Sequence, residues 1–284
     1  MNHTSATENL AAYETARQRI SHELRVNASV GPHADIERRV AFLTDTLYAS
    51  GRTALVLGIS GGIDSTVTAK MCQLAVERVR QTGHPAVFIA MRLPCGAQHD
   101  EGDAAAALDF IQADQVLTGN IQPASDACLG ELIAAGLVFR DRQHQDFVLG
   151  NIKARQRMVL QYAVAGALDG LVVGTDHAAE AVTGFFTKYG DGAADIVPLT
   201  GLTKRRIRTI AQLLGAPDAL VGKAPTADLE TLAPGKPDED VFGFTYDNID
   251  DFLEGRPVPS AIAQAVLDRY HATAHKRHLP VAPG

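Results

Sequence analysis

Four segments of the chain have the residue pattern of strands, and residues with helical spacing separate them. They lie at 55–59, 86–93, 115–121 and 170–175. In the first two, hydrophobic residues follow one another directly instead of alternating with polar ones, which is typical of parallel strands covered by helices on both faces. The regular alternation of strands and helices predicts an α/β fold that surrounds a parallel sheet.

Apolar residues three and four positions apart predict the helices. We expect Asp35, Thr203 and Ser260 to be N-caps, because short polar side chains before an apolar stripe favour helix starts. The last helix is expected to end in a basic turn within residues 271–278. The predicted helices are 7–25, a helix from Asp35, a crossover helix through Val67 and Val79, 101–111, 126–138, a basic helix within 146–162, a helix starting at 176–180, 204–214, 246–254 and a helix from Ser260.

Two of these helices precede the first strand and carry apolar stripes that need a partner surface. They lie outside a minimal nucleotide-binding core. The pattern leaves two interpretations open, in which they either cover the edge of their own core or pack on a second subunit.

The end of the first strand has the composition of a phosphate-binding loop, residues 58–65, which read Gly-Ile-Ser-Gly-Gly-Ile-Asp-Ser. Gly61 and Gly62 lack the side chains that would keep a phosphate away from backbone N–H groups. Ser60 and Ser65 add hydroxyl donors at the start of the next helix, where the helix dipole favours an anion.

Asp64 does not fit a site that binds only an anion, because a carboxylate repels phosphate unless a cation lies between them. Its presence predicts Mg²⁺ that bridges carboxylate and phosphate oxygens. Thr175 and Glu180 follow the fourth strand and are expected at the same sheet edge, so Glu180 supplies a second carboxylate for the metal. The basic first turn that starts at Lys204 opposes the helix dipole unless an anion lies nearby, and ATP phosphates would supply one.

Composition limits the remaining possibilities. The 284 residues are 46% hydrophobic, show no obvious linker and predict a single domain, with residues 1–34 as a helical extension. Residues 222–240 are rich in proline, glycine and charge and predict a flap. The formal charge of −7 argues against a nucleic-acid surface. Three separate cysteines argue against a disulfide scaffold, and the absence of a signal-peptide or membrane-span pattern predicts a cytoplasmic protein.

Several motifs, taken together, closely resemble one family, the ammonia-dependent NAD synthetases of the ATP pyrophosphatase superfamily. The resemblance runs in order from about residue 35 to residue 278. Its motifs are the phosphate-binding loop, Gly-Asn-x-Lys-Ala-Arg, Gly-Thr-Asp-His-Ala-Ala-Glu, Phe-Phe-Thr-Lys-Tyr-Gly-Asp-Gly, Lys-Ala-Pro-Thr-Ala-Asp-Leu-Glu, Thr-Tyr-Asp-Asn-Ile-Asp-Asp and His-Lys-Arg.

The resemblance implies a doubly wound, mostly parallel sheet of the adenine nucleotide alpha hydrolase-like type and a tight homodimer. It also implies an activity, in which ATP adenylates the nicotinate carboxylate of deamido-NAD and ammonia then converts the adenylate to NAD. It assigns the metal to Asp64 and Glu180, and gives Asp64, Asp191 and Lys204 catalytic roles. It assigns ATP to Gly58, Ile59, Ser60, Gly61, Gly62, Ile63, Asp64, Ser65, Thr175, Lys204 and Thr226, and deamido-NAD to Arg155, Lys188, Asp195, His275 and Lys276.

Three alternatives stay open from the residues alone. They are another adenylating amidotransferase, a thiolating relative that would need a persulfide-bearing cysteine near the loop, and a nucleotide sensor without catalysis. The cysteine positions do not favour the second, and the paired carboxylates Asp64 and Glu180 argue against the third.

Overall fold

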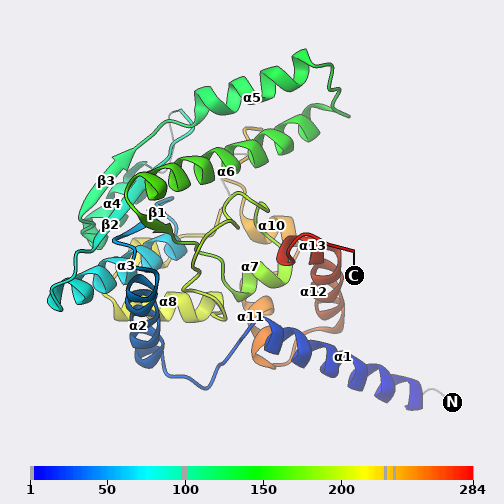
Figure 1. Ribbon diagram of the computed structural model, residues 1–284. Helices are drawn as coiled ribbons and strands as arrows, with labels where there is room; N and C mark the ends of the chain where they lie inside the picture. The colour runs from blue at the N-terminus through cyan, green and yellow to red at the C-terminus, as the bar shows by residue number, and fades with distance from the viewer. Residues whose placement is uncertain (1–2, 97–100, 227–228, 233–234, 284) are drawn as a thin grey trace.

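The computed structural model describes residues 3–96, 101–226, 229–232 and 235–283. Strands and helices alternate between residues 54 and 172, and helices alone form the named elements before and after this part (Figure 1). The elements are α1 (His3–Glu23), α2 (Pro32–Ser50), β1 (Ala54–Gly58), α3 (Ile63–Gln81), β2 (Val87–Arg92), α4 (Glu101–Ile111), β3 (Gln115–Thr118), α5 (Gln122–Ala134), α6 (Arg142–Ala167), β4 (Gly170–Val172), α7 (Ala178–Thr183), α8 (Lys204–Leu213), α9 (Asp218–Val221), α10 (Asp238–Phe242), α11 (Tyr246–Glu254), α12 (Ser260–Ala272) and α13 (Ala274–Arg277).

The four predicted strands form one parallel sheet in the order β3-β2-β1-β4. The chain therefore builds the sheet outward from β1 to β3 and then returns to the other side of β1 with β4. This reversal is the topological switch point of a doubly wound sheet, where ligands bind beyond the carboxyl ends of the strands. The predicted fold class is confirmed.

Helices cover both faces of the sheet (Figure 1). Leu55 and Leu57 point into a cluster that also contains residues of α2, α3 and α8. Val56, between them, points to the opposite face, where it packs with Ala165 of α6. All three strand residues are buried, which explains why hydrophobic residues follow one another directly in β1.

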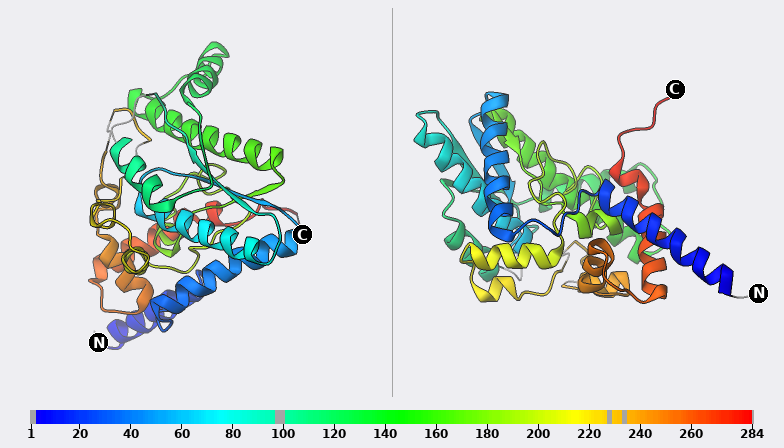
Figure 2. Two further views of the ribbon diagram at one scale, coloured as in Figure 1. Left: turned by 90° about the vertical axis from the view of Figure 1, so that its left-hand side faces the viewer. Right: turned by 90° about the horizontal axis from the view of Figure 1, so that it is seen from below.

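The two helices before the sheet pack on their own chain. Val40, Leu43 and Leu47 of α2 lie in the same cluster as α3 and α8. Ile20 of α1 is fully buried with residues of α7, α11 and α12, while the N-terminal end of α1 points away from the rest of the molecule (Figure 1 and the right-hand view of Figure 2). The buried residues of both stripes therefore cover their own core, as the edge-covering interpretation predicts.

Several helix boundaries differ from the sequence predictions. The helix expected from Asp35 begins at Pro32 after an N-cap at Gly31, and α12 is N-capped by Pro259 instead of Ser260. Asp35 is buried in the first turn of α2, where it accepts a 2.7 Å hydrogen bond from Arg38. Asp35 therefore pairs with arginine side chains inside the structure instead of capping the start of the helix.

The expected basic end of the last helix is also different, because α12 ends at Ala272 and the basic residues form the separate helix α13. Helix α5 begins at Gln122, four residues before the predicted start at 126. Within the described part of the chain, no helix combines the length and apolar character that a membrane span requires.

The connection between α1 and α2 passes close to the loop before α8, and this contact predicts a stability difference. Gly201 has φ +83°, and a Cβ there would lie 2.3 Å from the carbonyl oxygen of Arg25. Gly215 has nearly the same φ, +84°, with open space around a Cβ. We expect Gly215→Ala to cost about 1 kcal/mol for the left-handed backbone, and Gly201→Ala to cost about 1–3 kcal/mol more for the steric overlap.

Urea unfolding of both variants measures this difference, with Gly215→Ala as the matched control. Equal unfolding free energies for the two variants would show that the α1–α2 connection does not pack tightly against the loop.

Candidate active site

The phosphate-binding loop connects β1 to α3 at the switch point of the sheet. Gly61 has φ +82°, and a Cβ at this position would lie 2.9 Å from the backbone nitrogen of Ala104, so the turn requires glycine. Gly62 is the N-cap of α3 in extended conformation. The loop thus ends at the positive end of a 19-residue helix, an arrangement that favours anion binding.

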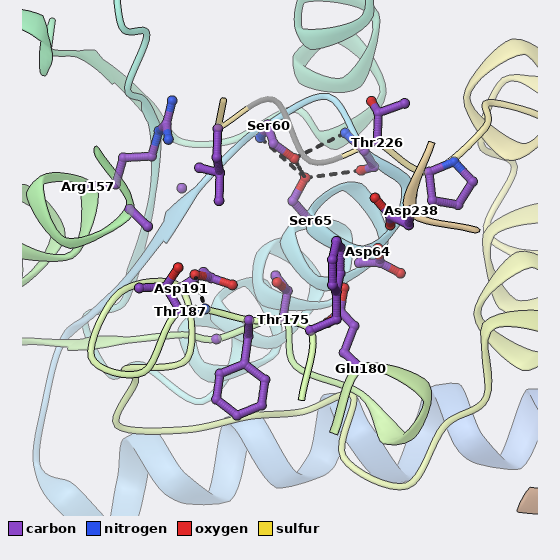
Figure 3. Close-up of a pocket in the computed structure, with 18 of the residues that line it drawn as sticks. Ser60, Asp64, Ser65, Arg157, Thr175, Glu180, Thr187, Asp191, Thr226 and Asp238 are labelled. Atoms are coloured by element: carbon purple, nitrogen blue, oxygen red, sulfur yellow. Dashed lines mark hydrogen bonds between the residues drawn. The ribbon is translucent and has the colours of Figure 1, made fainter. Parts of the chain in front are cut away.

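Serine side chains brace this loop from within. Ser65 donates a hydrogen bond to the carbonyl of Gly62 at 3.0 Å, and its hydroxyl lies 3.1 Å from that of Ser60. The Ser60 hydroxyl in turn accepts the Gly62 N–H at 3.2 Å (Figure 3). Both hydroxyls therefore hold the loop in shape at the start of α3.

A compact charged cluster lies beneath the loop. The ammonium of Lys204, at the start of α8, lies 2.6 Å from Oδ2 of Asp64, at the start of α3. Nε2 of His177 is 3.6 Å from Oδ1 of Asp64 and 3.5 Å from Oε1 of Glu180. The cluster thus brings the two carboxylates predicted to share a metal close to the same imidazole nitrogen. One possible metal-ligand atom from each of Asp64, His177 and Glu180 lies within 4.8 Å of the other two.

Burial controls the protonation of this cluster. It would raise the pKa of Asp64, but the Lys204 ammonium outweighs it and leaves that pKa below its usual value. Burial and the Asp64 charge raise the pKa of Glu180 well above normal. Burial lowers the pKa of His177 to about 3, so the ring is neutral at pH 7. One lysine balances one carboxylate, and a second cation near Glu180 would favour its ionised form.

Protein carboxylates balance most of the basic first turn of α8. The predicted N-cap is confirmed, since the Thr203 side chain accepts the Arg206 N–H. Asp250 of α11 accepts the backbone N–H groups of Lys204 at 3.0 Å and Arg205 at 2.7 Å. Protein carboxylates thus lie beside all three basic side chains of this turn, and Lys204 is the one that also lines the cleft, where ATP phosphates stay the predicted anion.

Arg205 illustrates this balance. Its guanidinium lies 3.0 Å from Asp251, 3.1 Å from Glu254 and 3.3 Å from Asp247, all on α11.

Above the cluster lies a cleft of about 520 Å³ (Figure 3). Its walls come from the phosphate-binding loop, the end of β4, the loop around Thr187, and parts of residues 223–241. Lys276 of α13 also reaches it, and there donates hydrogen bonds to the carbonyls of Gly184 at 2.8 Å and Phe186 at 2.7 Å. The predicted site residues that line the cleft are Gly58, Ile59, Ser60, Gly62, Ile63, Asp64, Ser65, Thr175, Glu180, Asp191, Lys204, Thr226 and Lys276.

Four predicted substrate residues do not line this cleft. Arg155 donates hydrogen bonds to the carbonyl of Lys188 at 3.3 and 3.4 Å, and Lys188 donates one to the carbonyl of His275. These three residues therefore lie together on the outside of α6 and α13. Asp195 lies next to the sheet, where its carboxylate accepts the Val172 N–H at 2.7 Å.

Some residues of the site carried no recognised signal in the sequence. His177 lies in the Gly-Thr-Asp-His-Ala-Ala-Glu motif, but its position between two carboxylates depends on the turn into α7. Asp238 lines the cleft and accepts a 2.9 Å hydrogen bond from the Tyr246 hydroxyl. Gln161 accepts the Gly58 N–H at 2.8 Å, and Arg157 lies one turn earlier on the same helix face. The spacing of four residues between Arg157 and Gln161 could have predicted that both lie on the same face of this helix.

The fold and this cleft place the chain in the adenine nucleotide alpha hydrolase-like class of α/β proteins, with a phosphate-binding loop at the switch point. The model of the NAD synthase family matches residues 35–280. The chain belongs to the NAD synthase family.

Relatives and solved structures agree with this assignment. A protein of Streptomyces coelicolor named NH(3)-dependent NAD(+) synthetase is 64% identical over 267 residues, which cover 94% of this chain and 97% of that protein. The crystal structure of NAD+ synthetase from Burkholderia pseudomallei has a TM-score of 0.82 at 55% identity and covers 94% of this chain and 98% of that one. The structure of NMN synthetase from Francisella tularensis has a TM-score of 0.77 at 33% identity, with 90% and 99% covered.

The ion pair between Lys204 and Asp64 predicts a coupled effect on stability. We expect Lys204→Met to lower the unfolding free energy by about 3–5 kcal/mol, because it leaves a largely buried carboxylate without its cation. The double variant Lys204→Met/Asp64→Asn should recover part of this loss, since no charge remains to be balanced. Urea unfolding in the presence of a chelator measures all three proteins.

The loss should also depend on pH. The lowered pKa of Asp64 stabilises the wild type above the unfolded-state pKa of aspartate, about 3.9, and this contribution disappears as the pH falls. The variant carboxyl can take up a proton instead, so the gap between wild type and Lys204→Met should narrow on acidification. A double variant no more stable than Lys204→Met, or a gap independent of pH, would contradict the ion pair.

Proposed function

We propose that this chain is an ammonia-dependent NAD synthetase, which converts deamido-NAD, ATP and ammonia into NAD, AMP and pyrophosphate. The observation that carries the proposal is the cleft, where a phosphate-binding loop meets two carboxylates and a lysine, in a chain 64% identical to a protein named for this activity.

ATP is proposed to bind along the loop at the switch point. The N-terminal end of α3, with its helix dipole, suits its phosphates. Thr175 and Thr226 line opposite walls of the same cleft and complete the proposed nucleotide site. Residues 222–240 are the proposed flap over it, and the described ones include Lys223, Thr226 and Lys236 in the cleft wall; residues 227, 228, 233 and 234 lie outside the described part.

Mg²⁺ is the proposed cofactor, and Asp64 and Glu180 would hold it. The residues fit, because both donors are carboxylate oxygens, which Mg²⁺ prefers, and Oδ1 of Asp64 is buried without a hydrogen-bond partner among the described residues. A divalent cation would also offset the charge that Glu180 carries when ionised. When bound, the metal would neutralise charge on the phosphates.

The reaction proposed for the cleft has two steps. The nicotinate carboxylate attacks the α-phosphorus of ATP, and pyrophosphate leaves. Ammonia then attacks the carbonyl carbon of the adenylate, AMP leaves, and the nitrogen loses a proton. The first step needs positioning and charge neutralisation, which the loop N–H groups and Lys204 can provide without a protein nucleophile.

Asp191 is the candidate residue for the second step. It lines the cleft, and its Oδ1 accepts the Thr187 N–H at 2.9 Å (Figure 3). We assign it the ordering of the loop around the reacting carboxylate, and its carboxylate is the proposed proton acceptor for the attacking nitrogen.

A homodimer is proposed because the deamido-NAD residues do not all reach one cleft. Arg155, Lys188 and His275 lie together outside it, whereas Lys276 lines it. Helices α5 and α6 expose large hydrophobic side chains, a feature typical of interfaces: Leu132, Ile133 and Val159. A second copy packed on this surface would allow one dinucleotide to touch both subunits. The helices α1 and α2 have no part in this proposal.

A second candidate activity is the amidation of nicotinate mononucleotide. The structure from Francisella tularensis, named NMN synthetase, covers 90% of this chain with a TM-score of 0.77. The two substrates share the reacting carboxylate and differ in the adenylate half that the Arg155, Lys188 and His275 group is proposed to contact.

One assay separates these activities. With ATP, Mg²⁺ and ammonium chloride, we expect deamido-NAD to yield NAD, AMP and pyrophosphate in equal amounts. Nicotinate mononucleotide should react much more slowly, because it lacks the adenylate half, and ammonia-free glutamine should not replace ammonium. Chromatography of the nucleotides measures the products. Faster turnover of nicotinate mononucleotide would favour the second candidate, and pyrophosphate release without either substrate would contradict both.

Mixed dimers test the shared site. Arg155→Ala and Asp64→Asn are each expected to abolish most activity alone. If Arg155 of one subunit acts on substrate held at Asp64 of the other, a mixed dimer has one intact site and one doubly damaged site, so mixing restores activity. Subunit exchange followed by the NAD assay measures this recovery. No recovery in verified mixed dimers, or a fully active monomer in sedimentation, would refute the shared site.

A further inference from the structure

One stripe of α6 faces both the flap and the phosphate-binding loop. Its residues are spaced by four, three, four and four, so they follow one side of the helix. The second half of the stripe holds the loop side of the cleft, through Gln161, which accepts the Gly58 N–H, and Arg157, which donates to the carbonyl of Leu93 at 3.0 Å. The complete stripe is Asp146, Gly150, Lys153, Arg157 and Gln161.

The first half of the stripe binds a short part of the flap, residues 229–232, here called the strap. The Asp146 carboxylate, buried in the structure, accepts the Thr231 N–H at 3.0 Å and the Leu232 N–H at 2.7 Å, one on each oxygen. Lys153 donates to the carbonyl of Leu229 and to the Thr231 hydroxyl, both at 3.0 Å. Charged side chains thus bind three polar groups of the strap's backbone and one hydroxyl. Hydrogen bonds to charged groups are stronger than those between neutral groups.

Gly150 lets the strap approach the helix closely. A Cβ at this position would lie 3.2 Å from Cβ of Leu229 and 3.3 Å from its carbonyl oxygen. Asp146, Gly150 and Lys153 therefore form a fitted seat for the strap. Figure 1 shows the orange segment that contains the strap passing beside the first half of α6.

The seat fixes the strap at the mouth of the cleft. Leu229 and Glu230 line the cleft, as does Thr226 just before them. The flap is tied on its other side by Lys223, whose ammonium lies 2.6 Å from Asp103 of α4. The described part of the flap thus spans the cleft between two helices, with its firmest polar contacts on α6.

We propose that Asp146 is a positioning residue, which together with Lys153 seats the strap and so keeps water from the acyl-adenylate until ammonia arrives. This proposal rests on the proposed function. The side reaction it prevents is hydrolysis, in which water attacks the carbonyl carbon of the adenylate, the carboxylate re-forms and AMP leaves. Each such event consumes one ATP, which has already released pyrophosphate, and makes no NAD.

Exclusion of water requires the strap to be seated during the interval between the two steps. Because the same side of α6 holds the Gly58 loop through Gln161, the helix fixes the distance between the phosphate-binding loop and the strap. The seat is therefore part of the same rigid element that positions the ATP side of the cleft.

The experiment compares Asp146→Ala, Asp146→Asn and Lys153→Met with Asp126→Ala, an exposed carboxylate on α5, as the control. Amide hydrogen exchange, resolved by NMR, follows the N–H groups of Thr231 and Leu232. The NAD assay gives the ratio of pyrophosphate released to NAD formed at limiting ammonia. Thermal unfolding checks that each variant is folded.

We expect Asp146→Ala to speed exchange of both amides by about tenfold or more, because it removes a charged acceptor from each. Asp146→Asn should release mainly one of them, since its amide group keeps one acceptor oxygen. The ratio of pyrophosphate to NAD should be higher than in the wild type for Asp146→Ala and Lys153→Met. Asp146→Asn should give a ratio between those of Asp146→Ala and the wild type, and Asp126→Ala should give the wild-type ratio.

Unchanged exchange at Thr231 and Leu232 in Asp146→Ala would overturn the seat. Faster exchange with a wild-type ratio of pyrophosphate to NAD would overturn the positioning role. If the wild type makes no NAD, the proposed function fails, while faster exchange in Asp146→Ala would still support the seat.

Discussion

The structure of the cleft depends on one buried ion pair, between Lys204 and Asp64. The two side chains begin helices α8 and α3, which are far apart in the sequence, and their 2.6 Å contact fixes where those helix starts meet. A buried charge without a partner is costly, so the pair also limits what can lie nearby. Lys204 is held in place by Asp250, which accepts its backbone N–H, and Asp64 by the turn at Gly61. The floor of the cleft is therefore rigid and carries one more carboxyl, Glu180, than the lysine can balance.

This second carboxyl, which ionises readily only beside a further cation, accounts for the features proposed above the floor. The proposed cation would lie beside Glu180, and the proposed phosphates would lie beside the cation, at the N-terminal end of α3. Helix α6 then relates the rigid floor to the flap, because Gln161 holds the loop at Gly58 while Asp146 holds the backbone at Thr231. Binding, charge neutralisation and exclusion of water thus belong to different elements that share one cleft.

Local sequence pattern predicted the parts of the fold that local forces determine. The four strands, the phosphate-binding loop, and helices such as Tyr246–Glu254 follow from apolar runs, helical spacing and glycine positions. The pattern could not show that α11 carboxylates balance Arg205, that Asp35 is buried in a helix instead of capping it, or that His177 lies between Asp64 and Glu180. Each of these depends on contacts between residues distant in the chain. The outer group of Arg155 and Lys188 came only from the family resemblance, because a basic helix face by itself is usually solvated.

The central claim is that the cleft directs the carboxylate oxygen of the substrate to the α-phosphorus of ATP. Transfer of an isotope label tests this most directly, with deamido-NAD that carries ¹⁸O in its nicotinate carboxylate. Attack at the α-phosphorus, followed by cleavage of the carbon–oxygen bond by ammonia, predicts one ¹⁸O atom in each AMP and none in pyrophosphate, as measured by mass spectrometry. Recovery of the label in inorganic phosphate beside ADP, or its absence from AMP, would contradict the account.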